Sequence, residues 1–115
     1  MKADNSKQII KHIFKYTNDI NNLIDRFGND YDIFEEDIAY NSACSFAVFQ
    51  IGELTVKLSD EFKQKHDEIP WHKMRGVRNI IAHQYGSVDM EIMWEIMMDS
   101  IPELKSFAEK ILNQV

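Results

Sequence analysis

The stretch "NSKQIIKHIFKYTNDINNLIDRFGND", residues 5–30, has the clearest structural pattern in the chain. Its apolar side chains recur at spacings of three and four, which places them on one face of an α-helix. They are Ile9, Ile10, Ile13, Ile20, Leu23, Ile24 and Phe27. Asn5 or Ser6 can cap the start, and Gly28 with Asn29 suits the left-handed backbone of a helix end. The stretch therefore predicts a long amphipathic helix.

The helical period continues through the rest of the chain. After a short turn at "YDIFEED", a second apolar stripe is formed by Ile38, Ala39, Ala43, Phe46, Ala47, Gln50, Ile51, Leu54 and Leu58. Ser59 and Asp89 predict N-caps of later helices, and Ser100 and Glu103 have capping-box spacing. Met93, Met97 and Met98 are expected to pack in the core or at an interface. No alternating segment bounded by turns indicates a strand. We expect an all-α fold, an antiparallel bundle of about five helices, in one domain spanning residues 1–115.

Composition limits the class of protein. Hydrophobic residues make up 44% and charged residues 28% of the chain, as in folded proteins. Cys44 is the sole cysteine, which excludes an internal disulfide and favours a reducing compartment. No apolar run is long enough for a signal peptide or a membrane span. We therefore expect a cytoplasmic protein that does not enter a membrane.

The net charge of −6 hides a local basic segment. Residues 69–88 contain no Asp or Glu but include Lys73, Arg75 and Arg78, together with His72 and His83. A helix that begins at Pro70 and ends near Tyr85 would carry them. Such a segment in an acidic protein is a candidate phosphate site.

A helical wheel divides this motif helix into two faces at about 100° per residue. The polar face carries Arg75, Arg78, Asn79 and His83, with the small residues Gly76 and Ala82 beside them. The apolar face carries Met74, Val77 and Ile81. The polar face can equally be the ordinary solvated side of an amphipathic helix. Because Arg78 and His83 are not neighbours on the helix surface, a joint task would need a substrate or a second subunit to bridge them.

These residue types suit attack by a ribose 2′-hydroxyl on the adjacent phosphate of single-stranded RNA. A neutral imidazole can take the hydroxyl proton, and a guanidinium can stabilise the negative charge that grows on the phosphoryl oxygens. This chemistry needs no metal or cofactor, and the sequence has no Cys/His cluster with zinc spacing.

The string "RNIIAHQY", residues 78–85, has the form R-x4-H-x-Y and resembles the signature of the HepT-like toxins of the HEPN superfamily. The surrounding stretch "IGELTVKLSDEFKQKHDEIPWHKMRGVRNIIAHQYGSVDMEIMWEIMMDSIPELK", residues 51–105, is similar to that family almost end to end. The segment before it departs from the expected pattern, with Phe49 and Gln50 where many relatives have more charge.

The resemblance implies a homodimer with the two motifs facing each other. It also implies a metal-independent endoribonuclease toxin of a type II-like or type VII toxin–antitoxin system, neutralised by a minimal nucleotidyltransferase antitoxin. Arg78 and His83 become the catalytic residues, with Arg75, Asn79 and Lys73 holding the substrate. Tyr85 becomes the site of adenylylation, although it can also simply pack over the helix end.

Three points stay open at the level of sequence. Glu53 in "IGE" can orient a motif side chain or be a surface glutamate. The chain can be a catalytically silent HEPN partner that binds a nucleotidyltransferase, a hypothesis favoured by its acidity. The third alternative is a helical scaffold without chemistry, which ranks last because it would leave the cationic face unexplained.

Overall fold

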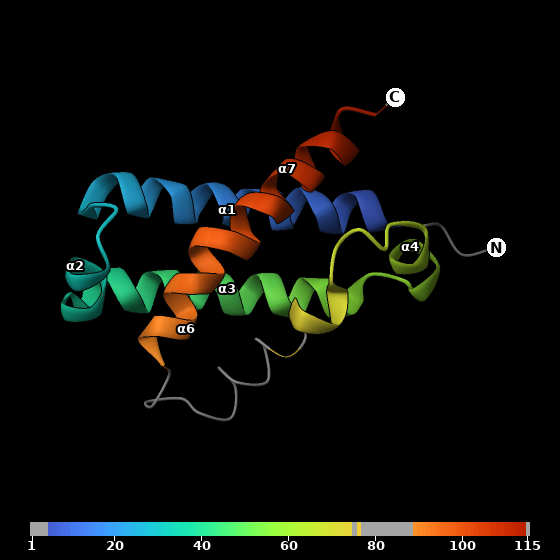
Figure 1. Cartoon of the computed structure of the whole chain (residues 1–115). Coiled ribbons are helices and arrows are strands. Elements are labelled where there is room, and N and C mark those ends of the chain that lie inside the picture. Colours follow the sequence, from blue (N-terminus) through green and yellow to red (C-terminus); the bar gives the residue numbers. More distant parts are fainter. Residues whose placement is uncertain (1–4, 75, 77–88, 115) are drawn as a thin grey trace.

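The computed structural model of the chain describes residues 5–74, 76 and 89–114. Two long helices, α1 (Ser6–Phe27) and α3 (Ile38–Lys57), lie side by side and antiparallel (Figure 1). The short helix α2 (Tyr31–Glu36) forms the link between them, and α4 (Asp60–Lys65) follows α3. Every helix and turn of this described part fits the all-α class that the sequence predicts, and it contains no strand.

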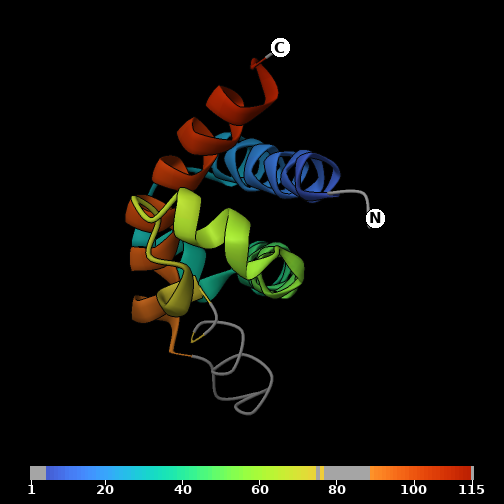
Figure 2. The same cartoon turned by 90° about the vertical axis from the view of Figure 1, so that its right-hand side faces the viewer.

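A third layer crosses this pair obliquely (Figures 1 and 2). It consists of α6 (Met90–Glu95), the π-helical turn η1 (Ile96–Ser100) and α7 (Ile101–Leu112), which follow one another without a break in helical backbone. The expected capping box at Ser100 is therefore wrong, because Ser100 has helical angles and its side chain makes no capping hydrogen bond. Pro102 gives the physical reason: its ring would crowd the carbonyl of the preceding turn, and the wider π-turn before it relieves that crowding.

Carboxylate or hydroxyl caps begin α2, α3, α4 and α6. The Asp30 side chain accepts hydrogen bonds from the N–H groups of Asp32 and Ile33, and the Asp37 side chain accepts one from the backbone N–H of Tyr40. Two predicted caps are confirmed: Ser59 accepts from the N–H of Phe62, and Asp89 from those of Glu91 and Ile92. At the start of α1 the prediction is confirmed only in position, because Asn5 is the N-cap residue but its side chain makes no capping hydrogen bond. Each cap satisfies an N–H that has no partner within its own helix.

The core lies where the three layers meet. From α1 it takes Ile9, Ile10, Ile13 and Ile20, as predicted, and from the third layer Met93 and Met97. Rings pack at the α2 end, where Tyr40 stacks on Phe27 with centroids 4.9 Å apart and meets Phe34 edge to face at 5.1 Å. This cluster fixes the turn between the two long helices.

The predicted stripe on α3 is partly wrong. Its buried face consists of Tyr40, Cys44, Ala47, Val48, Ile51, Gly52 and Thr55. Ile38 is 79% exposed and Phe46 is 58% exposed. The error has a simple cause: α3 is apolar on most sides, so its sequence does not reveal which side the neighbouring helices cover.

No helix among the described residues is both long and apolar enough to cross a membrane.

Candidate functional site

The start of the motif helix is anchored by Trp71. Its indole nitrogen Nε1 donates a hydrogen bond of 2.9 Å to the carbonyl oxygen of His66, and its ring lies 5.7 Å from that of Phe107 on α7. The carbonyl oxygen of Pro70 accepts from the N–H groups of Lys73 at 3.0 Å and Met74 at 3.4 Å. Residues 71–74 are helical from this point, so a proline and a buried tryptophan together set the direction of the helix.

The described part of this helix confirms the buried face that the wheel predicts at Met74, which is 2% exposed and belongs to the core. Lys73, which the wheel assigns to neither face, is exposed. Gly76 is half-buried, and a Cβ placed on it would meet no atom of the described residues within 4 Å.

The remaining candidate residues of the motif lie outside the described residues. These are Arg75, Arg78, Asn79, His83 and Tyr85, so their roles stay predictions. Glu53 is described: it is half-buried on α3, about one turn before the helix end. Its role in orienting a motif side chain also stays a prediction.

A groove of about 330 Å³ borders the start of the motif helix. One wall is Lys73 with Gly76, and the other comes from α6 and η1: Ile92, Glu95, Ile96, Asp99 and Ser100. We call this the motif-side groove. Glu95, Asp99 and Lys73 are all exposed, so the described part of the groove lining includes two carboxylates and one ammonium. These acids were not predicted as part of the site because they lie beyond the acid-free segment, which ends at residue 88. Only their four-residue spacing on a helix could have indicated a shared face.

Buried titratable groups of the core offer no alternative chemistry. Cys44 is fully buried, and burial raises the pKa of its thiol to about 12, so at neutral pH it is a protonated, unreactive side chain. Burial also raises the pKa of Tyr40 to about 12, and its hydroxyl donates to the carbonyl oxygen of Gly28 at 3.0 Å. Within the described ranges, no three His, Cys, Asp or Glu side chains come together as a metal site would need.

Comparison with known proteins relates nearly the whole chain to one family. The sequence profile of a family described as "Ribonuclease HepT-like" matches residues 7–111. A protein of Thermococcus cleftensis named "Probable ribonuclease HepT" is 34% identical over 93 residues, a match that covers 77% of this chain and 83% of that protein.

Two further relatives are similarly close. A protein of Caldanaerobacter subterraneus subsp. tengcongensis, named as a candidate RNase, is 33% identical over 93 residues, covering 80% of this chain and 83% of that protein. One of Methanocaldococcus jannaschii, also named as a candidate RNase, is 33% identical over 113 residues, covering 95% of this chain and 92% of that protein. No solved structure matches the chain significantly.

Proposed function

The chain belongs to the HepT-like ribonuclease family, and from this membership we propose that it is an endoribonuclease that cleaves single-stranded RNA without a metal ion. The observation that carries the proposal is the extent of the family match. It covers residues 7–111 and so includes the whole R-x4-H-x-Y motif, residues 78–85.

In the proposed mechanism the neutral imidazole of His83 takes the proton of a ribose 2′-hydroxyl. The 2′-oxygen then forms a bond to the adjacent phosphorus, and the bond from phosphorus to the 5′-oxygen of the next nucleotide breaks. That 5′-oxygen takes a proton from water as it leaves, and the imidazolium of His83 returns its proton to water, so the products are a 2′,3′-cyclic phosphate and a 5′-hydroxyl. Arg78 stabilises the extra negative charge of the transition state, while Arg75, Asn79 and Lys73 hold the phosphate backbone.

We infer that the active form is a homodimer. Arg78 and His83 are five residues apart on a predicted helix and so do not lie side by side. Two motifs that face each other across a two-fold axis would bring the arginine of one protomer close to the histidine of the other.

The family relationship also supports a regulatory partner. We propose that a minimal nucleotidyltransferase antitoxin neutralises this toxin by transferring AMP from ATP to the Tyr85 hydroxyl, with release of pyrophosphate. Co-expression with that partner should raise the mass of the Tyr85-containing peptide by one or more adenylyl groups and leave Tyr85→Phe unmodified. Modification of another residue would rule out Tyr85 as the target.

The second candidate function is that of a catalytically silent partner of the nucleotidyltransferase. The motif-side groove favours it, because Glu95 and Asp99 place negative charge next to Lys73 and weaken attraction for RNA phosphates. In that case the acidic surface would serve protein binding rather than substrate binding.

One experiment separates the two functions. Purified chain, shown by mass to be unmodified, is incubated with mixed-sequence single-stranded RNA in excess EDTA, and the product ends are analysed. We expect cyclic-phosphate ends that disappear with His83→Ala but persist with His72→Ala, a matched control because His72 is exposed near the start of the same helix. No cleavage by the unmodified chain would favour the silent partner.

A further inference from the structure

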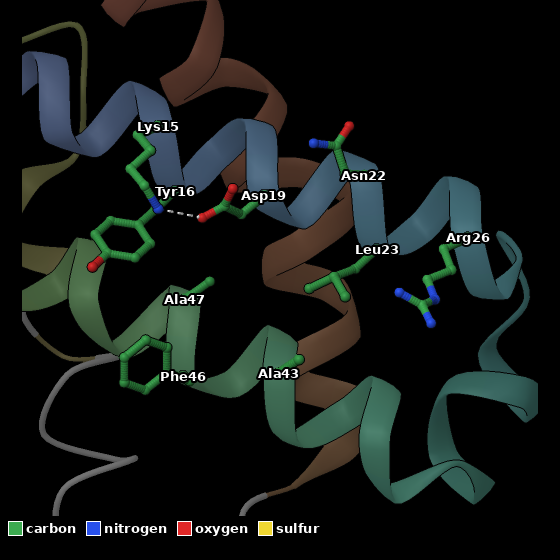
Figure 3. A pocket seen from close by; sticks show the side chains of 9 residues that line it. All are labelled: Lys15, Tyr16, Asp19, Asn22, Leu23, Arg26, Ala43, Phe46 and Ala47. Atoms are coloured by element: carbon green, nitrogen blue, oxygen red, sulfur yellow. Dashed lines mark hydrogen bonds and ion pairs between the residues drawn. The ribbon is translucent and has the colours of Figure 1, made fainter.

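A second and larger groove, of about 530 Å³, lies between α1 and α3 (Figure 3). It shares no described lining residue with the motif-side groove. Its apolar surface is made by Leu23 of α1 with Ala43 and Ala47 of α3, whose small side chains leave room between the two helices. Polar side chains of α1 form its rim: Lys15, Asp19, Asn22 and Arg26. We call it the α1–α3 groove.

Two aromatic rings stand at one end of the α1–α3 groove. Tyr16 and Phe46 meet edge to face, with centroids 6.4 Å apart and ring planes at 71°. Phe46 is 58% exposed although it belongs to a central helix of the fold. An exposed ring beside an apolar cavity is costly in water, but it provides a surface on which a nucleobase can stack.

The exposed side of α1 is basic although the whole chain carries −6. Lys7, Lys11 and Lys15 are exposed and follow one another at intervals of four, so they advance by about 6 Å per step along one side of the helix. Arg26 is exposed in the same arc of the wheel. These four residues are the basic stripe, and they outnumber the two acids of α1, Asp19 and Asp25.

Local contacts hold part of the basic stripe in place. The Nζ atom of Lys15 lies 2.8 Å from a carboxylate oxygen of Asp19 and 4.6 Å from the centroid of the Tyr16 ring. The hydrogen bond to Asp19 raises the pKa of Lys15, so its ammonium stays charged beside the aromatic pair. Lys7 Nζ donates to the carbonyl oxygen of Gln114 at 3.3 Å.

The charge pattern decides between possible occupants of the α1–α3 groove. A second copy docked here about a two-fold axis would bring two basic stripes against each other, and like charges in close contact are unfavourable. A single-stranded nucleic acid has both groups that this surface can bind: phosphates for the basic stripe and flat bases for the aromatic pair.

We propose that the α1–α3 groove is a second RNA-binding surface, which holds a single-stranded segment of the substrate away from the phosphate that is cut. Bases stack on Phe46 and Tyr16, and Lys11, Lys15 and Arg26 contact the backbone. This inference rests on the proposed ribonuclease function. It implies that an RNA long enough to reach both surfaces binds more tightly than a shorter one.

The test uses a fluorescent 2′-O-methyl oligonucleotide, which the proposed mechanism cannot cut, and measures its binding by anisotropy over a range of salt concentrations. Phe46→Ala should weaken binding by about fivefold or more, and Phe46→Trp should restore it. Lys11→Ala combined with Lys15→Ala should lower the slope of log affinity against log salt by about 1.4. The matched controls are Ile38→Ala, an exposed apolar residue of α3 outside the groove, and Lys110→Ala, an exposed lysine of α7.

Cleavage of long and short RNA distinguishes this proposal from the ribonuclease function itself. Phe46→Ala should raise KM for a long RNA and leave unchanged the cleavage of one too short to reach both surfaces. Groove variants that bind RNA like their controls, while the wild type cleaves, would overturn the second surface alone. A change of oligomeric state without a change in RNA affinity would instead assign the groove to a second copy. If the wild type neither binds nor cleaves RNA, both proposals fall.

Discussion

Gly28 ends α1 with a backbone angle φ of +119°, a value that side chains other than that of glycine rarely adopt. Its N–H donates to the carbonyl oxygen of Ile24 at 2.8 Å, and its own carbonyl accepts from Tyr40. A Cβ at this position would also lie 3.3 Å from Cδ1 of Ile33. This residue therefore determines how the chain leaves α1 and enters α2.

Gly28→Ala should lower the free energy of unfolding by about 1–3 kcal/mol, because alanine is strained at this φ. Gly76→Ala is the matched control. Gly76 is helical and no described residue lies within 4 Å of its Cβ position, so the change should be neutral or stabilise by about 0.5–1 kcal/mol. Urea unfolding of both variants measures the difference, and equal effects would mean that the backbone at Gly28 is not restrictive.

Cys44 predicts a pH dependence of stability. Burial raises the pKa of its thiol from 9.0 to about 12, so between these values the folded protein binds more protons than the unfolded chain. The stability gained from this site is complete below pH 9 and is lost as the pH rises toward 12. Cys44→Ala, which lacks the titrating group, should therefore lose less stability than the wild type between pH 8 and pH 10.5. If the wild type and Cys44→Ala lost the same free energy of unfolding between the two pH values, the raised pKa of Cys44 would be contradicted.

At the scale of elements, Asp89 defines where the third layer begins. Its carboxylate accepts hydrogen bonds from the N–H groups of Glu91 at 2.9 Å and Ile92 at 3.3 Å. Asp89→Ala should cost about 1 kcal/mol by thermal or urea unfolding, the usual value of an N-cap. Glu109→Ala, which removes an exposed acid from α7, should change stability little, and equal losses would indicate a general charge effect.

Local signals of this kind made much of the fold predictable. The caps at Ser59 and Asp89 and the separate turn at residues 31–36 were recognisable because the interactions that form them lie within four residues. The π-turn before Pro102 was not recognisable. Ser100 and Glu103 have the sequence spacing of a capping box, and this spacing is the same whether or not the preceding backbone is already helical. On α3, Phe46 was assigned to the core because its exposure depends on which helices lie beside it.

The candidate site, like the fold, was predictable only in part. The sequence placed Met74 on the buried face of the motif helix, and its 2% exposure agrees. It did not reveal Glu95 and Asp99, since their place in the motif-side groove depends on how the third layer crosses the bundle. Nor did it reveal the α1–α3 groove, whose lining comes from two helices.

At the scale of the whole molecule, charge is divided between surfaces. The basic stripe lies along α1, and the motif segment of residues 69–88 is basic as well, whereas Glu95 and Asp99 place acids beside Lys73. A single motif segment contributes only three formal positive charges, few for a polyanion. A dimer that joins two of them would double that number at one cleft, so the proposed assembly and the proposed substrate support each other.

This assembly predicts complementation between inactive chains. If Arg78 of one protomer acts with His83 of the other, a heterodimer of Arg78→Ala and His83→Ala contains one intact site and one site that lacks both groups. Purified through two different tags, it should recover about half of the wild-type activity per dimer, although each parent homodimer is inactive. Cleavage in excess EDTA measures this directly.

The reciprocal heterodimer makes the test decisive. Wild type paired with a chain carrying both Arg78→Ala and His83→Ala should be inactive if each site takes one residue from each protomer, because both sites then lack one group. If Arg78 and His83 of the same chain act together, this second heterodimer keeps half of the activity and the first has none. Each heterodimer carries one Arg78→Ala and one His83→Ala substitution in total, and the two differ only in whether these lie in separate chains or in one. They therefore share composition and charge. Only the arrangement of the site across the dimer can separate their rates.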